Sequence, residues 1–125
     1  MSKGKSIALW VVQGILAIQF LVPGVLKLMG NPGWIVRFRA WGYPEKFYLL
    51  VGLVETVGAV VFLVPRLSAY GAAALAIVMA GAFVTHILHS EIARAFVTVT
   101  LGILVAFAGY SRSRAWRQQK IAREG

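Results

Sequence analysis

Apolar residues along this chain gather into four blocks, which cover residues 7–28, 47–64, 69–88 and 92–110. Each block is close to the ~20 residues that an α-helix needs to cross a hydrocarbon layer ~30 Å thick. Charged residues and histidines are few within the blocks: Lys27, Glu55, His86 and Arg94. We therefore expect an all-α membrane protein with four transmembrane helices. The first block is too long for the apolar part of a secretory signal, so we expect it to remain as a helix.

The connections between the later blocks are short, which restricts how the helices can be joined. Residues 65–68 link the second and third blocks, and residues 89–91 link the third and fourth. Such links can join only antiparallel neighbours. The sequence thus predicts an up-down bundle of four helices, in which residues 1–125 form one membrane domain with a basic tail at residues 111–125.

The longer connection, residues 29–46, predicts a short helix between the first two spans. Asn31 is a suitable N-cap, Pro32 suits the first helical position, and Gly42 is a stop signal. Three aromatic residues recur at helical spacing in this segment: Trp34, Phe38 and Trp41. Such an apolar stripe favours a helix that lies in the membrane interface or caps the bundle.

Composition and charge support a membrane setting. Of the 125 residues, 59% are hydrophobic and only 14% are charged, which is too apolar for a soluble domain of this size. The net charge of +9 would suit nucleic acid, but many basic residues lie in the tail, where anionic lipid head groups would attract them: Arg112, Arg114, Arg117, Lys120 and Arg123. We therefore expect the lipid bilayer, and not nucleic acid, as a partner. Because the chain has no cysteine, it cannot form a disulfide or a thiolate metal site by itself.

The distribution of basic residues also predicts orientation. Most lysines and arginines lie in the N-terminal segment, in the 65–68 turn and in the tail. Lys and Arg are enriched on the cytoplasmic side of membrane proteins, so we expect both termini to be cytoplasmic. The 29–46 segment, with Lys27, Glu55, His86 and Arg94, then belongs to the outer half of the bundle.

Glu55 is the most informative residue, because a carboxyl group deep in an apolar span is costly. Its helical neighbours Gly52, Gly58 and Ala59 are small, which marks this side of the helix as packed against other helices. Intramembrane ionisable groups are usually functional, so Glu55 is our first candidate site residue. The alternative is a buried polar pair that only fixes helix packing.

Other polar residues of the outer half complete a candidate pocket. Lys27 could meet Glu55 or extend to the head groups, and His86 could exchange a proton with a bound molecule or bond a helix carbonyl. An apolar cavity with a few convergent polar groups is typical of a small-molecule site, here one for a lipophilic ligand. We expect three residues to act in any chemistry: Glu55, Lys27 and His86. The ligand-binding set adds Arg94, Trp34 and Trp41. The inner half offers little beyond Gln13 and a few hydroxyl groups.

A metal site receives little support. His86, His89 and Glu91 have a spacing that could place ligands on one ion, but two histidines and one acid in a loop are a weak signal. We therefore predict no metal.

Five short motifs resemble those of the DoxX-like family over roughly residues 7–110: Gly24-x-x-Lys27-Leu28, Gly42-Tyr43-Pro44, Gly52-x-x-Glu55, Pro65-Arg66, and Gly81-Ala82 before His86. The resemblance implies a four-helix membrane protein, usually bacterial and therefore of the inner membrane. It also implies quinone chemistry, since the namesake of the clan is similar to a subunit of a thiosulfate:quinone oxidoreductase. Other members resemble cargo receptors and assembly chaperones, so the fold does not settle the activity.

The leading hypothesis is a small membrane subunit that binds a quinone or a similar lipophilic molecule and works with a redox partner. A non-enzymatic binding or assembly protein is the alternative. A small multidrug exporter is less favoured, because such exporters carry their glutamate in the first helix, where this chain has Gln13 and Gln19. Whether a reaction is catalysed, and whether the chain forms a homo-oligomer, stays open.

Overall fold

The computed structural model describes residues 2–124, and in that range the chain is helical throughout apart from short connections. The elements are α1 (Lys3–Leu28), α2 (Pro32–Ala40), α3 (Phe47–Leu63), the 3-10 turn η1 (Pro65–Leu67), α4 (Ser68–Leu88) and α5 (Ile92–Glu124). The all-α prediction is confirmed. The short helix α2 begins as expected, with the side chain of Asn31 accepting from Gly33 N at 3.0 Å.

Three helical stretches are long and apolar enough to cross a membrane: Lys3–Leu28, Pro65–Leu88 and Ile92–Glu124. Helix α3 is equally apolar but shorter, with 17 residues. Large apolar side chains such as Ile18, Ile77 and Phe107 lie more than half exposed on the outer surface. A water-soluble domain would not present so many, so this surface fits a hydrocarbon environment.

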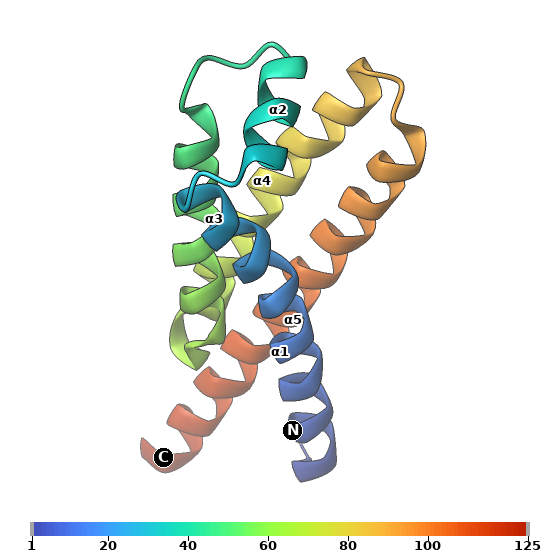
Figure 1. Ribbon diagram of the computed structural model, residues 1–125. Helices are drawn as coiled ribbons and strands as arrows, with labels where there is room; N and C mark the ends of the chain where they lie inside the picture. Colours follow the sequence, from blue (N-terminus) through green and yellow to red (C-terminus); the bar gives the residue numbers. More distant parts are fainter. Residues whose placement is uncertain (1, 125) are drawn as a thin grey trace.

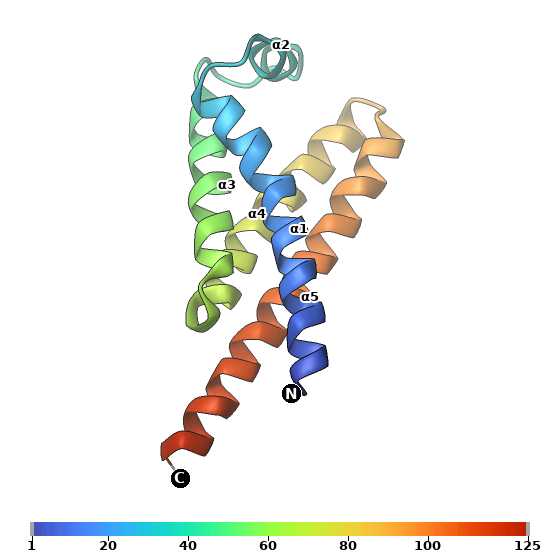
Figure 2. The same ribbon diagram turned by 60° about the horizontal axis from the view of Figure 1, so that its bottom comes forward.

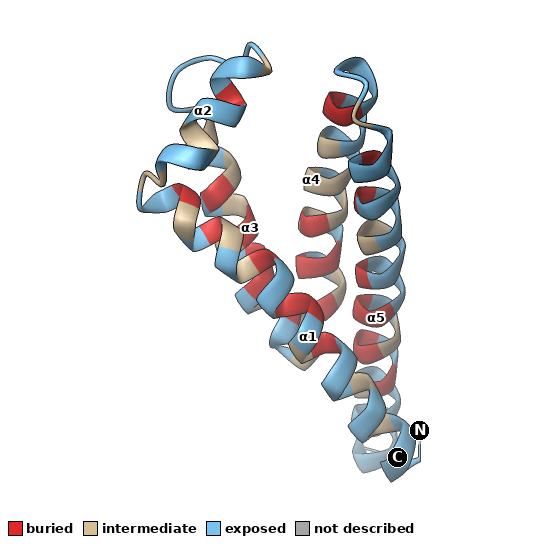
Figure 3. Cartoon of the chain, turned by 45° about the vertical axis from the view of Figure 1, so that its right-hand side comes forward, coloured by how far each residue is buried: buried red, intermediate tan, exposed pale blue. Residues whose placement is uncertain are grey.

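The long helices form two antiparallel pairs, α1 with α3 and α4 with α5, and α3 packs on α4 to join the pairs. Figures 1 and 2 show both termini at one end of the molecule and α2 at the other. The two pairs converge towards the termini and diverge towards α2, as the turned view in Figure 3 shows. The arrangement of the helices is therefore a V that is closed at one end.

Small residues explain the tight closure of the V. A Cβ on Gly71 of α4 would collide with the backbone of Phe62 in α3, and a Cβ on Gly109 of α5 would collide with Ala72 of α4. Glycine at these positions lets the helix backbones approach closely. The apolar core lies around these contacts and includes Phe62 and Leu75, both with no exposed surface.

At the two ends of the chain the helices run beyond the expected membrane spans. Helix α1 begins at Lys3, and α5 continues past Tyr110 to Glu124 without a break. No glycine or proline follows Tyr110 until the final residue, so nothing in the sequence stops the helix there. The expectation that Arg112 lies among lipid head groups is wrong, because this side chain is buried with 5% of its surface exposed.

Candidate functional site

A cleft of about 580 Å³ lies between the two helix pairs, beneath α2. Its walls are mainly aliphatic and aromatic, with side chains from all five α-helices. The polar and charged side chains along it are few: Gln19, Lys27, Arg37, Tyr43, Glu55, Thr85, His86, Arg94 and Thr98. All six residues expected to act in chemistry or to bind a ligand line this one cleft: Lys27, Trp34, Trp41, Glu55, His86 and Arg94.

The Lys27 ammonium of α1 forms a buried ion pair with Glu55 of α3. The two side chains expose only 6% and 3% of their surfaces. Glycines bring them together, because a Cβ on Gly52 would lie 2.7 Å from the Lys27 Cβ, and one on Gly24 would lie 3.1 Å from the Glu55 Cβ. The small residues around Glu55 thus hold α1 and α3 close enough for the pair to form. A desolvated pair of this kind is not an efficient stabiliser, which favours a functional reason for its presence.

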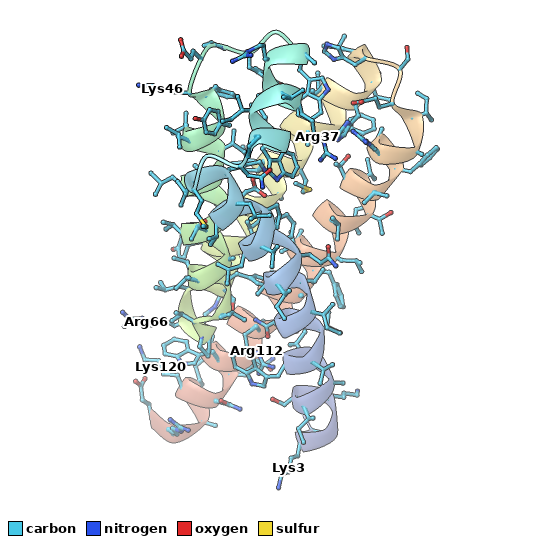
Figure 4. All side chains as sticks on the ribbon, in the orientation of Figure 1. Lys3, Arg37, Lys46, Arg66, Arg112 and Lys120 are labelled. Atoms are coloured by element: carbon cyan, nitrogen blue, oxygen red, sulfur yellow. The ribbon has the colours of Figure 1, made fainter. Side chains whose placement is uncertain are left out.

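Helix α2 covers the ion pair with aromatic rings. The Lys27 Nζ lies 4.0 Å from the centroid of the Trp34 ring, within the range of a cation–π interaction. Phe38 is the buried residue of α2 and packs against an aromatic cluster: Trp34, Trp41, Tyr43, Phe47 and Tyr48. The predicted aromatic stripe therefore faces the bundle as a cap. On the same helix, the guanidinium of Arg37 lies 4.9 Å from the Trp34 ring and extends over the cleft (Figure 4).

Glu91, in the connection between α4 and α5, links these helices to Trp41 at the end of α2. His86 Nδ1 lies 2.8 Å from Glu91 Oε1, and Trp41 Nε1 donates to the same oxygen at 3.2 Å. Arg94 Nη1 lies 3.4 Å from Glu91 Oε2. The hydrogen bond with His86 holds the pKa of Glu91 below its usual range. Three expected ligand-binding residues are thus grouped around a carboxylate that sequence analysis considered only as a metal ligand.

A second contact, between Tyr43 and Thr85, joins the connection that follows α2 to α4. The Thr85 hydroxyl donates to Gly81 O at 2.9 Å, so it accepts from the Tyr43 hydroxyl that contacts it. His89 Nδ1 lies 2.8 Å from Thr85 O, so this imidazole bonds a helix carbonyl, and His89 does not line the cleft. Within residues 2–124 no three His, Asp or Glu side chains are grouped to hold a metal ion.

A separate polar cluster lies at the closed end of the V, where little but Gln13 was expected. Arg112 of α5 donates from Nε to Gln13 Oε1 at 2.8 Å, and from Nη1 and Nη2 to Ser6 Oγ and Ser6 O at 3.1 and 2.9 Å. Gln13 Nε2 donates in turn to Phe62 O at 3.1 Å. The Arg112 guanidinium also lies 4.1 Å from the Trp10 ring. Gln13 and hydroxyl groups were expected at this end of the bundle, but the buried Arg112 that joins them was not. The sequence features that could have indicated this cluster are Gln13, a glutamine inside an apolar span, and Arg112, the first arginine after the last span.

The apolar outer surface of these helices and the buried Lys27–Glu55 pair are features of a small helical membrane protein. The model of the DoxX-like family matches residues 11–108. The chain therefore belongs to the DoxX-like family, as its motifs predicted. Lys27, Glu55, His86 and Arg94 lie inside the matched range, whereas Arg112 and the rest of the tail lie outside it. No curated protein and no solved structure matches this chain.

Proposed function

We propose that this protein binds a lipophilic molecule with a polar head, of the quinone class, in the cleft between its two helix pairs. The observation that carries the proposal is the buried Lys27–Glu55 pair in the wall of an otherwise apolar cleft. An ammonium group has three N–H donors, so Lys27 can donate to a ring carbonyl as well as to Glu55. The apolar walls suit a hydrocarbon tail.

The proposed role includes a redox partner. Reduction of a quinone to a quinol takes two electrons and two protons. The electrons would come from the partner protein, since quinone chemistry needs a reductant and this chain has no cysteine to act as a thiol donor. Glu55, Lys27 and His86 are the groups in the cleft wall that can hold a proton near the ligand. Their part in any reaction would be to bind the head and pass protons to it.

The binding experiment uses purified protein in mild detergent, with a short-chain ubiquinone or menaquinone added and the complex counted by native mass spectrometry. Gly81 lines the cleft and has open space where a Cβ would project, so Gly81→Phe should place a ring in the cleft without moving helices. We expect the wild type to bind one quinone. The obstruction should weaken binding by roughly ten- to hundred-fold, the equivalent of ~1–3 kcal/mol of steric conflict.

Ala73→Phe is the matched control, because Ala73 lies exposed on the same helix away from the cleft. Equal binding by both variants would place the quinone outside the cleft. Absence of quinone binding by the wild type would contradict the proposal, and a copurified client protein in its place would support the assembly-protein alternative.

We further propose that the chain crosses the bacterial inner membrane four times, with both termini in the cytoplasm. Two observations support this: both termini lie at one end, and α3 is about 26 Å long at 1.5 Å per residue, close to the ~30 Å of a hydrocarbon layer. Single cysteines at Ser2 and Gln118 should be shielded from an impermeant thiol reagent in intact cells, and one at Asn31 should be labelled. Because the chain has no native cysteine, no background substitutions are needed. The reverse labelling pattern would show that the cleft lies in the inner leaflet.

A further inference from the structure

The start of the basic tail is fixed to the turn between α3 and α4. Ser113 Oγ of α5 accepts from Ala69 N at 2.9 Å and donates to Pro65 O at 3.4 Å. Ala115, one turn beyond the apolar part of α5, is buried. The α5 helix therefore contacts η1 and the start of α4. Its last turns then extend past the bundle, as Figures 1 and 2 show.

This contact places basic side chains of two distant segments around one hollow. The hollow has a volume of about 300 Å³ and is lined by Arg66 of η1 and by one stripe of α5: Trp116, Gln119, Lys120, Arg123 and Glu124. Three cations thus surround it with a single carboxylate. Figure 4 shows Arg66 and Lys120 on the same side of the molecule, one below the other, whereas Lys3 lies at the far end of α1.

The surroundings of the hollow suit the boundary of a membrane. Lys120 Nζ lies 5.4 Å from the centroid of the Trp116 ring, and tryptophan with lysine or arginine is typical of the interface between hydrocarbon and water. Leu63 and Val64, which precede Arg66 in the chain, present exposed apolar side chains at the end of α3. A ligand with a charged head and acyl chains would contact both kinds of surface.

We propose that this hollow binds the phosphate head group of one anionic phospholipid, whose acyl chains lie along the end of α3. Arginine and lysine together provide several N–H donors for the phosphate oxygens, and the arginines can bind them in a bidentate manner. The site differs from general attraction of a basic tail to the bilayer, because it needs one face of α5 and Arg66. It lies at the opposite end of the molecule from α2, and it does not depend on a ligand in the cleft.

The test compares two triple variants that lose the same charge. Arg66→Gln/Lys120→Gln/Arg123→Gln removes the cations of the hollow. Lys3→Gln/Arg114→Gln/Arg117→Gln removes exposed cations at the same end of the molecule that do not line it. Each protein is titrated in detergent with phosphatidylglycerol or phosphatidylcholine, and bound lipids are counted by native mass spectrometry.

We expect the wild type and the control variant to hold one phosphatidylglycerol in preference to phosphatidylcholine. The hollow variant should bind it roughly 100-fold more weakly, since each nearby cation contributes ~1 kcal/mol, about five-fold in affinity. If both variants bound phosphatidylglycerol equally weakly, net charge alone would explain the loss of binding, and the proposal would be overturned. Tight binding of glycerol phosphate alone, with no gain from acyl chains, would also overturn it, because the ligand would then be a free phosphate compound.

Discussion

Replacement of Lys27 by methionine is expected to lower the free energy of unfolding by about 3–5 kcal/mol. The reason is that Glu55 would remain inside the molecule, with 3% of its side-chain surface exposed, after losing its cation. Methionine keeps most of the length of the lysine stem, so loss of packing is a small part of the change. The measurement is thermal or denaturant unfolding of the purified protein in detergent micelles.

The double variant Lys27→Met/Glu55→Leu separates the charge effect from a general loss of packing. Replacement of both partners by apolar groups removes the unpaired carboxylate, so most of the lost stability should return. Lys3→Met is the surface control and should change the unfolding free energy by less than about 0.5 kcal/mol. If the double variant were no more stable than Lys27→Met, the buried pair would not be the cause of the loss.

Arg112→Leu is expected to destabilise the closed end of the V by about 3 kcal/mol, again measured by unfolding in detergent. The change removes three donors and leaves Gln13 Oε1 and the Ser6 oxygens without the partner that now satisfies them. Arg112→Lys should restore little of the lost stability, because an ammonium group cannot reproduce the planar set of guanidinium donors.

Arg114→Leu serves as the control, since Arg114 is exposed two residues further along α5. If the cluster acts as a unit, Gln13→Leu/Arg112→Leu should lose less stability than the sum of the two single variants. Simple additivity would show that the two side chains stabilise the bundle separately.

The parts of the structure that could be predicted from the sequence are those set by neighbouring residues, such as apolar runs and helix-capping residues. The helices followed from runs of apolar residues, and α2 followed from Asn31 and Pro32. The approach of Lys27 to Glu55 was one expected possibility, since the small residues beside Glu55 mark a contact between two helices.

Contacts that depend on how distant helices meet could not be predicted. Arg112 and Gln13 are separated by 99 positions, and no repeat or spacing links them. The position of Glu91 depends on Ser90, whose φ of 58° turns the chain so that Glu91 N donates to His86 O at 2.7 Å. Serine adopts such a backbone less readily than glycine, so the sequence contained no clear signal for this turn.

Because the two helix pairs meet only at the closed end of the V, a small rotation of one pair about that end would move the open end most. Arg94 lies about 27 Å along α5 from Arg112, so a rotation of about 5° at the closed end would move the far end by about 2 Å. Away from the closed end, two residues that follow α2 bond the other helix pair: Trp41 donates to Glu91 in the α4–α5 connection, and Tyr43 contacts Thr85 of α4. Such bonds can exchange with water or lipid head groups as they break. We therefore expect the cleft to widen while Phe62 and Leu75 stay packed, so that a bulky molecule could enter between the pairs without unfolding of any helix.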